Sequence, residues 1–135
     1  MSNPTVKKAI ELVKEQRYFD SIQGLMSWDL WAGLSKEGQP YRGEVSGYFT
    51  RQALSILTSS DTAKLVDELK QLDDSAFADI YEKAAVNALI DRYTKAVMIP
   101  PELQIKLRNF TGEAQRAWQD SIKMDSFENY KPWLK

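Results

Sequence analysis

The chain has 135 residues, of which 43% are hydrophobic and 11% aromatic, and these proportions are typical of one folded domain rather than of a disordered chain. Its 18 basic and 19 acidic residues give a net charge of -1, which provides no general attraction to nucleic acid or to anionic lipid. No apolar run approaches the roughly 20 residues that a membrane-spanning helix needs, so we expect neither a nucleic-acid partner nor a membrane partner.

The chain contains neither cysteine nor histidine. Without cysteine there is no disulfide framework, which suits a cytoplasmic protein, and the first residues lack the charged-then-apolar pattern of a secretory signal. A catalytic zinc site usually includes histidine among its three protein ligands, and Ser-His and Cys-His nucleophiles also need an imidazole. We therefore expect a cytoplasmic location, no catalytic residue, no metal site and no cofactor.

The first predicted helix begins at Asn3-Pro4, because Asn is a good N-cap and Pro fits the first helical turn. Apolar residues at helical spacing continue to about Trp31, either in one long helix with a bend or in two collinear helices. Gly24 weakens the middle of this segment by about 1 kcal/mol relative to Ala. Residues 33–40 are rich in Gly, Ser and Pro and are predicted to form an exposed loop.

Three further helices are predicted between residues 41 and 97. The first starts at about Tyr41 and runs to about Leu57, and a short helix ending near Leu69 follows Ser59-Ser60-Asp61. Asp73-Asp74-Ser75 breaks the pattern and is predicted to start a long helix over residues 74–97. No segment alternates as a strand does, so the predicted fold class is all-α.

The residues Ile99-Pro100-Pro101-Glu102 predict a stiff corner, because each proline fixes its own φ and disfavours helix in the residue before it. The next helix carries apolar or small residues at alternating intervals of four and three, a pattern that describes a narrow seam facing one neighbouring helix. These residues are Leu103, Leu107, Phe110, Ala114, Ala117, Ser121 and Met124. Asp125-Ser126-Phe127-Glu128 then resembles a second helix start with a carboxylate N-cap.

The two long helices on either side of the corner are expected to fold back on each other. The predicted architecture is therefore an all-α helical bundle with a long C-terminal helical hairpin, in a single domain over residues 1–135.

Several short blocks, taken in their order and spacing, resemble the N-terminal part of the Taq-type metallocarboxypeptidases, a family of helical zinc exopeptidases. The blocks are Trp28-Asp29, Arg42-Gly43-Glu44, Arg92-Tyr93-Thr94-Lys95-Ala96, Ile99-Pro100-Pro101-Glu102-Leu103, Glu113-Ala114-Gln115-Arg116-Ala117-Trp118, Asp125-Ser126-Phe127 and Tyr130-Lys131-Pro132-Trp133-Leu134. The resemblance covers most of this chain but only about the first quarter of such an enzyme. The family usually continues Trp-Asp with Gln-Glu and a proline-bearing turn, where this chain has Leu30-Trp31-Ala32-Gly33.

The resemblance implies a helical lid or cleft wall rather than a catalytic centre. The family's zinc site uses a His-Glu-x-x-His helix and a further Glu, and this chain contains no such motif. We therefore expect a non-catalytic domain without peptidase activity of its own. The alternatives are a stand-alone helical interaction or regulatory module, which could dock on a full-length carboxypeptidase, and a metal-independent enzyme. Adjacent carboxylates such as Asp73-Asp74 are expected to be solvated capping charges, which argues against the last alternative.

A candidate interaction surface follows from the aromatic residues and the family blocks, and it comprises Trp28, Asp29, Trp31, Arg92, Trp118 and Trp133. Trp28 and Trp31 are expected either to pack in the core or to line a cleft. Arg92 is expected to form an ion pair with Glu113 or Glu102, or to contact a substrate. Trp118 and Gln115 are expected to contact a third helix or to face the rest of an enzyme, and Trp133 follows Pro132 where the family pattern enters another helix. Unburied apolar faces favour self-association, so the expected partner is another copy of the chain or another protein.

Overall fold

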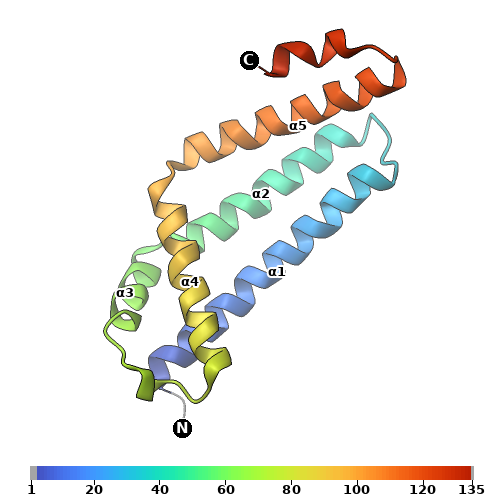
Figure 1. Ribbon diagram of the computed structural model, residues 1–135. Coiled ribbons are helices and arrows are strands. Elements are labelled where there is room, and N and C mark those ends of the chain that lie inside the picture. Colours follow the sequence, from blue (N-terminus) through green and yellow to red (C-terminus); the bar gives the residue numbers. More distant parts are fainter. Residues whose placement is uncertain (1–2, 135) are drawn as a thin grey trace. The chain divides into compact units, whose positions relative to one another are not determined.

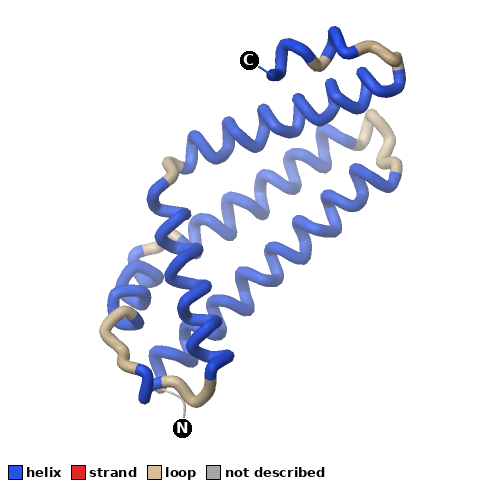
Figure 2. Tube along the Cα trace, in the orientation of Figure 1, coloured by secondary structure: helices blue, strands red, loops and turns tan. Residues whose placement is uncertain are grey.

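The computed structural model describes residues 3–134, and within this range every regular element is helical (Figures 1 and 2). The elements are α1 (Pro4–Ala32), α2 (Gln39–Leu57), α3 (Ser60–Leu69), the 3-10 helix η1 (Asp74–Ala76), α4 (Ile80–Met98), α5 (Pro101–Lys123) and the 3-10 helices η2 (Phe127–Asn129) and η3 (Lys131–Leu134). The all-α prediction is confirmed. None of the helices in the described range is long and apolar enough to cross a membrane.

The chain divides into two compact units, Met1–Met98 and Ile99–Lys135, which are described separately. α4 belongs to the first unit and α5 to the second. The predicted packing of these two helices as a hairpin, and the single domain over residues 1–135, therefore stay predictions. The predicted helix break at the prolines is present, since α4 ends at Met98 and α5 starts at Pro101.

α1 is one continuous helix of 29 residues, so the single helix is correct and the two collinear helices are wrong, while the bend stays a prediction. The side chain of Asn3 accepts a hydrogen bond from the backbone N–H of Thr5 at 2.8 Å, as expected for an N-cap. The helix ends at Gly33, whose φ of 107° lies in the left-handed region that favours glycine. The carbonyl oxygen of Asp29 there accepts the backbone N–H groups of Gly33 and of Leu34.

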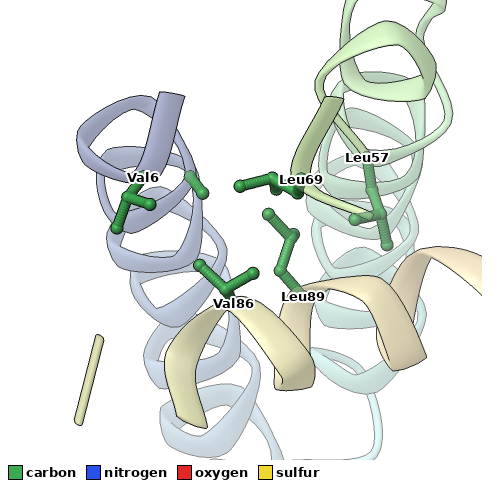
Figure 3. Close-up of a cluster of buried hydrophobic side chains, with 6 residues drawn as sticks. Val6, Leu57, Leu69, Val86 and Leu89 are labelled. Atoms are coloured by element: carbon green, nitrogen blue, oxygen red, sulfur yellow. The ribbon is translucent and has the colours of Figure 1, made fainter. Parts of the chain in front are cut away.

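A small apolar core joins the four α-helices of the first unit at the end where α1 begins. Side chains from α1, α2, α3 and α4 point toward one another in this cluster (Figure 3). Its fully buried members are Val6, Ala9, Leu57, Leu69, Val86 and Leu89. Burial of a Val or Leu side chain contributes roughly 1.5–3 kcal/mol, so this cluster is the main apolar contribution that holds the unit together.

Beyond that core, hydrogen bonds and one aromatic pair join α1 to the antiparallel α2, and the ring centroids of Phe19 and Phe49 lie 6.4 Å apart. Gln16 donates to the carbonyl oxygen of Ala53 at 3.2 Å, and Gln23 donates to the carbonyl oxygen of Ser46 and to the hydroxyl of Thr50, both at 2.9 Å. The hydroxyl of Ser46 donates back to Gln23 at 2.7 Å. The two glutamines lie seven residues apart on α1, and their partners Ser46 and Ala53 lie seven apart on α2. These bonds therefore fix one register between the two helices.

The long helix predicted from residue 74 begins later, at Ile80, so that boundary is wrong. The carboxylate of Asp73 accepts from the backbone N–H of Ser75 at 2.9 Å and closes a short 3-10 turn instead, and Phe77 after it is extended. Asp79 directly precedes α4, and its carboxylate accepts a hydrogen bond from the backbone N–H of Glu82. The carboxylate of Glu82 in turn accepts one from the backbone N–H of Ala78. This reciprocal arrangement resembles a capping box.

The second predicted start, at Asp125, is also wrong, because Asp125 ends α5 instead of capping a new helix. Its φ of 48° is left-handed, and the N–H of Ser126 bonds to the carbonyl oxygen of Ser121 at 2.9 Å. The N–H of Asp125 bonds to the carbonyl oxygen of Ile122 at 3.2 Å, which completes a Schellman motif. Only a short 3-10 helix, Phe127–Asn129, follows.

Two glycines of α1 are expected to respond in opposite directions to alanine. A Cβ added at Gly24 meets no atom within 4 Å, so Gly24→Ala is expected to stabilise the chain by up to about 1 kcal/mol through helix propensity. At Gly33 space is also open, but the positive φ makes Gly33→Ala destabilising by about 1–2 kcal/mol. Urea unfolding followed by circular dichroism measures both changes. Destabilisation by Gly24→Ala would contradict the open surface around the middle of α1.

Candidate interaction surface

Trp28 and Trp31 lie on the last two turns of α1, and both are exposed, at 69% and 59% of their surface. The expectation that they pack in the core is therefore wrong. α2 contacts α1 through the face that carries Gln16 and Gln23, and the core lies near the start of α1. The two tryptophans thus lie on a part of α1 that no described helix of the first unit covers.

Asp29, between the tryptophans, is bound to α2. Its Oδ2 lies 2.8 Å from Nη2 of Arg42, and the two side chains are 44% and 35% exposed. This ion pair connects the end of α1 to the first turns of α2, across the turn at residues 33–38. The Trp28-Asp29 block and the Arg42-Gly43-Glu44 block are therefore neighbours in space. Sequence reasoning named Asp29 but missed Arg42 as its partner.

Arg92 on α4 forms a bidentate ion pair with Asp20 on α1, with Nη1–Oδ2 and Nη2–Oδ1 distances of 2.7 Å each. The expected ion pair exists, but its expected partners, Glu113 and Glu102, are wrong. α4 packs on α1, so the guanidinium meets the acidic residue that α1 presents there. The hydrogen bonds from Arg92 lower the pKa of the Asp20 carboxyl, against a smaller opposite effect of burial. The same bonds raise the pKa of Arg92.

The spacing of residues along α1 could have identified Asp20 as the ion-pair partner of Arg92. Residues on one side of α1, which meets both α2 and α4, follow at intervals of three and four from Val6, through Ala9, Val13 and Gln16, to Asp20. An acidic residue in register with such a seam predicts a basic partner on the helix opposite. The family blocks drew attention to Arg92 alone.

Trp118 and Trp133 both belong to the second unit. Trp118 lies on α5 and is 42% exposed. Trp133 lies in η3 and is half-buried, and its ring packs on Phe110 of α5 with centroids 5.2 Å apart. The return of η2 and η3 along α5 therefore covers part of the α5 seam, whereas Leu103 and Leu107 stay exposed. Because the two units are described separately, the six candidate residues are not assembled into one surface, and their joint role stays a prediction.

Among the described residues, no three His, Cys, Asp or Glu side chains gather in a way that could hold a metal ion. A shallow hollow lies along a single helix, α1, away from the candidate residues, and it is lined by Lys8, Glu11, Leu12, Lys14, Glu15 and Tyr18. The features that remain are two paired charges between helices and exposed aromatic rings, which are typical of contact with other protein.

Loss of the Asp20–Arg92 pair is expected to destabilise the first unit modestly. Both side chains are more than one-third exposed, so solvent screening limits the effect of Asp20→Asn at neutral pH to about 0.5–1 kcal/mol. The folded carboxyl has a lowered pKa, so the contribution is complete above the unfolded value of about 4 and disappears as pH falls through the folded value.

Urea unfolding of the wild type and Asp20→Asn at neutral pH and in acid measures this difference. The matched control is Asp91→Asn, which removes the more exposed pair between Lys95 and Asp91 on α4 alone and is expected to cost less. An effect of Asp20→Asn that persists undiminished in strong acid would contradict the ion-pair explanation.

Comparisons of the sequence and of the structure with known proteins all relate the chain to one family. Residues 8–135 match the family model described as carboxypeptidase Taq (M32) metallopeptidase. Thermostable carboxypeptidase 1 of Pyrococcus furiosus is 26% identical over 132 residues, which are 98% of this chain and 26% of that protein. Carboxypeptidase 1 of Bacillus subtilis is 26% identical over 95% of this chain and 25% of its own length.

The fold agrees with the sequence match. The solved structure of Pyrococcus furiosus carboxypeptidase superposes with a TM-score of 0.78 at 25% identity, over 99% of this chain and 26% of the other. The chain thus spans about a quarter of the length of the curated relatives that it matches. With a family match that covers nearly all of its residues, the chain belongs to the carboxypeptidase Taq (M32) metallopeptidase family.

Proposed function

We propose that this chain is a non-catalytic helical module of the Taq carboxypeptidase family, which works through contacts with other protein and has no peptidase activity on its own. The observation that supports the proposal most directly is the complete absence of histidine and cysteine from the 135 residues. Catalytic zinc sites are built from three protein ligands, usually with histidine among them, and the zinc ion then activates water or polarises the peptide carbonyl. A chain without imidazole or thiolate lacks the usual ligands for that chemistry.

The family relationship suggests what the module does instead. The relatives are named carboxypeptidases, and this chain corresponds to about a quarter of them. A helical wall or lid beside a peptide-binding cleft needs rigid helices and exposed side chains but no metal ligand. The long helix α1, held by the Asp20–Arg92 and Asp29–Arg42 pairs, suits such a role. A cytoplasmic location is part of the proposal, and the absence of cysteine suits it.

The proposal is tested by measuring bound zinc and peptidase activity of the purified chain. We expect no stoichiometric zinc after incubation with zinc salt and removal of excess metal, and no release of the C-terminal residue from an N-terminally blocked peptide. Thermostable carboxypeptidase 1 of Pyrococcus furiosus is the positive control under the same conditions. Stoichiometric zinc together with release of C-terminal residues by this chain alone would refute the proposal.

A second candidate function is a regulatory module that docks on a full-length carboxypeptidase. The exposed aromatic rings of α1 favour it, since side chains of this kind are enriched in protein interfaces. If it holds, an immobilised full-length relative should retain this chain in a pull-down. Trp28→Ser is expected to weaken the retention, whereas Tyr81→Ser, at an aromatic residue on α4 that is 80% exposed against 69% for Trp28, serves as the control. Equal retention of the two variants would count against docking through α1.

A further inference from the structure

The second unit, Ile99–Lys135, is small for a stable folded domain. It has fewer than about 40 residues, and domains of that size usually need disulfides, a metal ion or association with other protein. The chain contains no cysteine, so a disulfide is excluded. The described residues also offer no group of His, Cys, Asp or Glu side chains that could hold a metal ion. What the unit itself contributes to its stability is therefore its own packing and helix propensity.

The packing within the second unit is sparse. Its main contact is the ring pair between Phe110 of α5 and Trp133 of η3, with centroids 5.2 Å apart. Among the described side chains of residues 99–134, only that of Ser121 is buried, and its hydroxyl has no hydrogen-bond partner in the described part of the chain. A buried hydroxyl without a partner lowers stability. The described residues of the unit thus form no buried apolar cluster like that of the first unit.

The helix α5 gains little from burial of its apolar side chains. Leu103, Leu107 and Ile122 expose 55%, 62% and 60% of their surface. In proteins, most helical stability comes from tertiary packing of one helix face. Gly112 lies in the middle of α5 and lowers the helix propensity relative to Ala. We therefore expect α5 to open more easily than a packed helix does.

The first unit has the contacts that the second lacks. Its four α-helices share six fully buried apolar side chains, and hydrogen bonds and ion pairs join α1 to α2 and to α4. These contacts all lie within Met1–Met98, so unfolding of α5 removes none of them. Pro100 and Pro101 carry no backbone N–H, so the hydrogen-bond ladder of α4 does not continue into α5.

We propose that the second unit is a conditionally folded segment, in which α5, η2 and η3 unfold in a transition of their own that leaves α1–α4 intact. This transition requires much less free energy than unfolding of the first unit, because less apolar surface is buried. Local opening of this kind is typical of segments that become ordered when they contact other protein. The transition does not depend on the proposed function, since neither metal binding nor peptidase activity enters it.

Native-state hydrogen exchange of the full chain, measured by mass spectrometry at increasing low concentrations of urea, tests the proposal. The amides bonded within α5 should be at least about 100-fold less protected than those of the core turns of α1 and α4, which carry Ala9 and Leu89. The protection of α5 should also depend less steeply on urea, because opening the second unit exposes less surface than unfolding the first.

Two glycine-to-alanine variants distinguish separate unfolding from one cooperative transition. Gly112 in α5 and Gly24 in α1 both lie within a helix, and a Cβ built at either meets no atom within 4 Å. Gly112→Ala should raise the protection of α5 about fivefold and leave that of α1 and α4 unchanged. Gly24→Ala is the matched control and should raise the protection of the first unit alone. Phe110→Ala, which removes the ring contact with Trp133, should lower the protection of α5 alone.

Each result decides the proposal. Lower protection of α5, together with separate responses to Gly112→Ala and Gly24→Ala, supports it. Protection of α5 equal to that of α1 and α4 overturns it, because the chain would then unfold as one cooperative unit. A Gly112→Ala variant that changes α1 and α4 as much as α5 overturns it for the same reason. Neither failure affects the proposed non-catalytic function, which bound zinc and peptidase activity test.

Discussion

The packing of three other helices against α1 is the constraint on which the first unit depends. α2, α3 and α4 all contact this one helix, and the buried cluster lies near its first turns. α1 extends well beyond that cluster, and its second half is held by polar contacts together with the Phe19–Phe49 ring pair and the buried Met26. Gln23 binds Ser46 and Thr50, Asp20 binds Arg92, and Asp29 binds Arg42. Individually these contacts are weak, but together they fix α2 and α4 in one register along α1.

The exposure of large apolar side chains near the end of α1 follows from this packing of the helices. An apolar core needs several helices around it, and within the first unit they converge only at the end where α1 begins (Figure 3). Toward its other end α1 has α2 alongside it, and within the first unit α3 and α4 lie toward the end where α1 begins (Figure 1). The large apolar side chains at that end, among them Leu25, Trp28 and Trp31, are therefore exposed because of where the helices lie and despite a sequence pattern that resembles a buried face.

Sequence reasoning predicted the helices well and their partners poorly. The caps at Asn3 and Ser59 and the proline corner were readable because each depends on residues a few positions apart. The start of α4 at Ile80 was missed because two cap signals, Asp73 and Asp79, lie six residues apart, and the first closes only a 3-10 turn. The positive φ at Asp125 was missed because glycine is the usual residue at that position of a Schellman motif. The pairs Asp20–Arg92 and Asp29–Arg42 depend on which helices pack together, and spacing along one helix does not determine that. Burial in the core is one of the two alternatives that the sequence offers for Trp28 and Trp31, because their spacing matches that of a packed helix face. The spacing is the same whether or not another helix covers that face.

The polar contact between α1 and α2 also bears on the order in which the first unit assembles. Gln23 and Ser46 are 23 positions apart in the chain, whereas Asp20 and Arg92 are separated by 72. Bringing two segments together costs more entropy as the intervening loop lengthens, so the hairpin of α1 and α2 closes at lower cost than the docking of α4. The hydrogen bonds of Gln16 and Gln23 set the register of this hairpin. The hairpin then offers α4 a surface on which it can dock. The buried cluster draws side chains from all four helices, so it is complete only when each of them has docked.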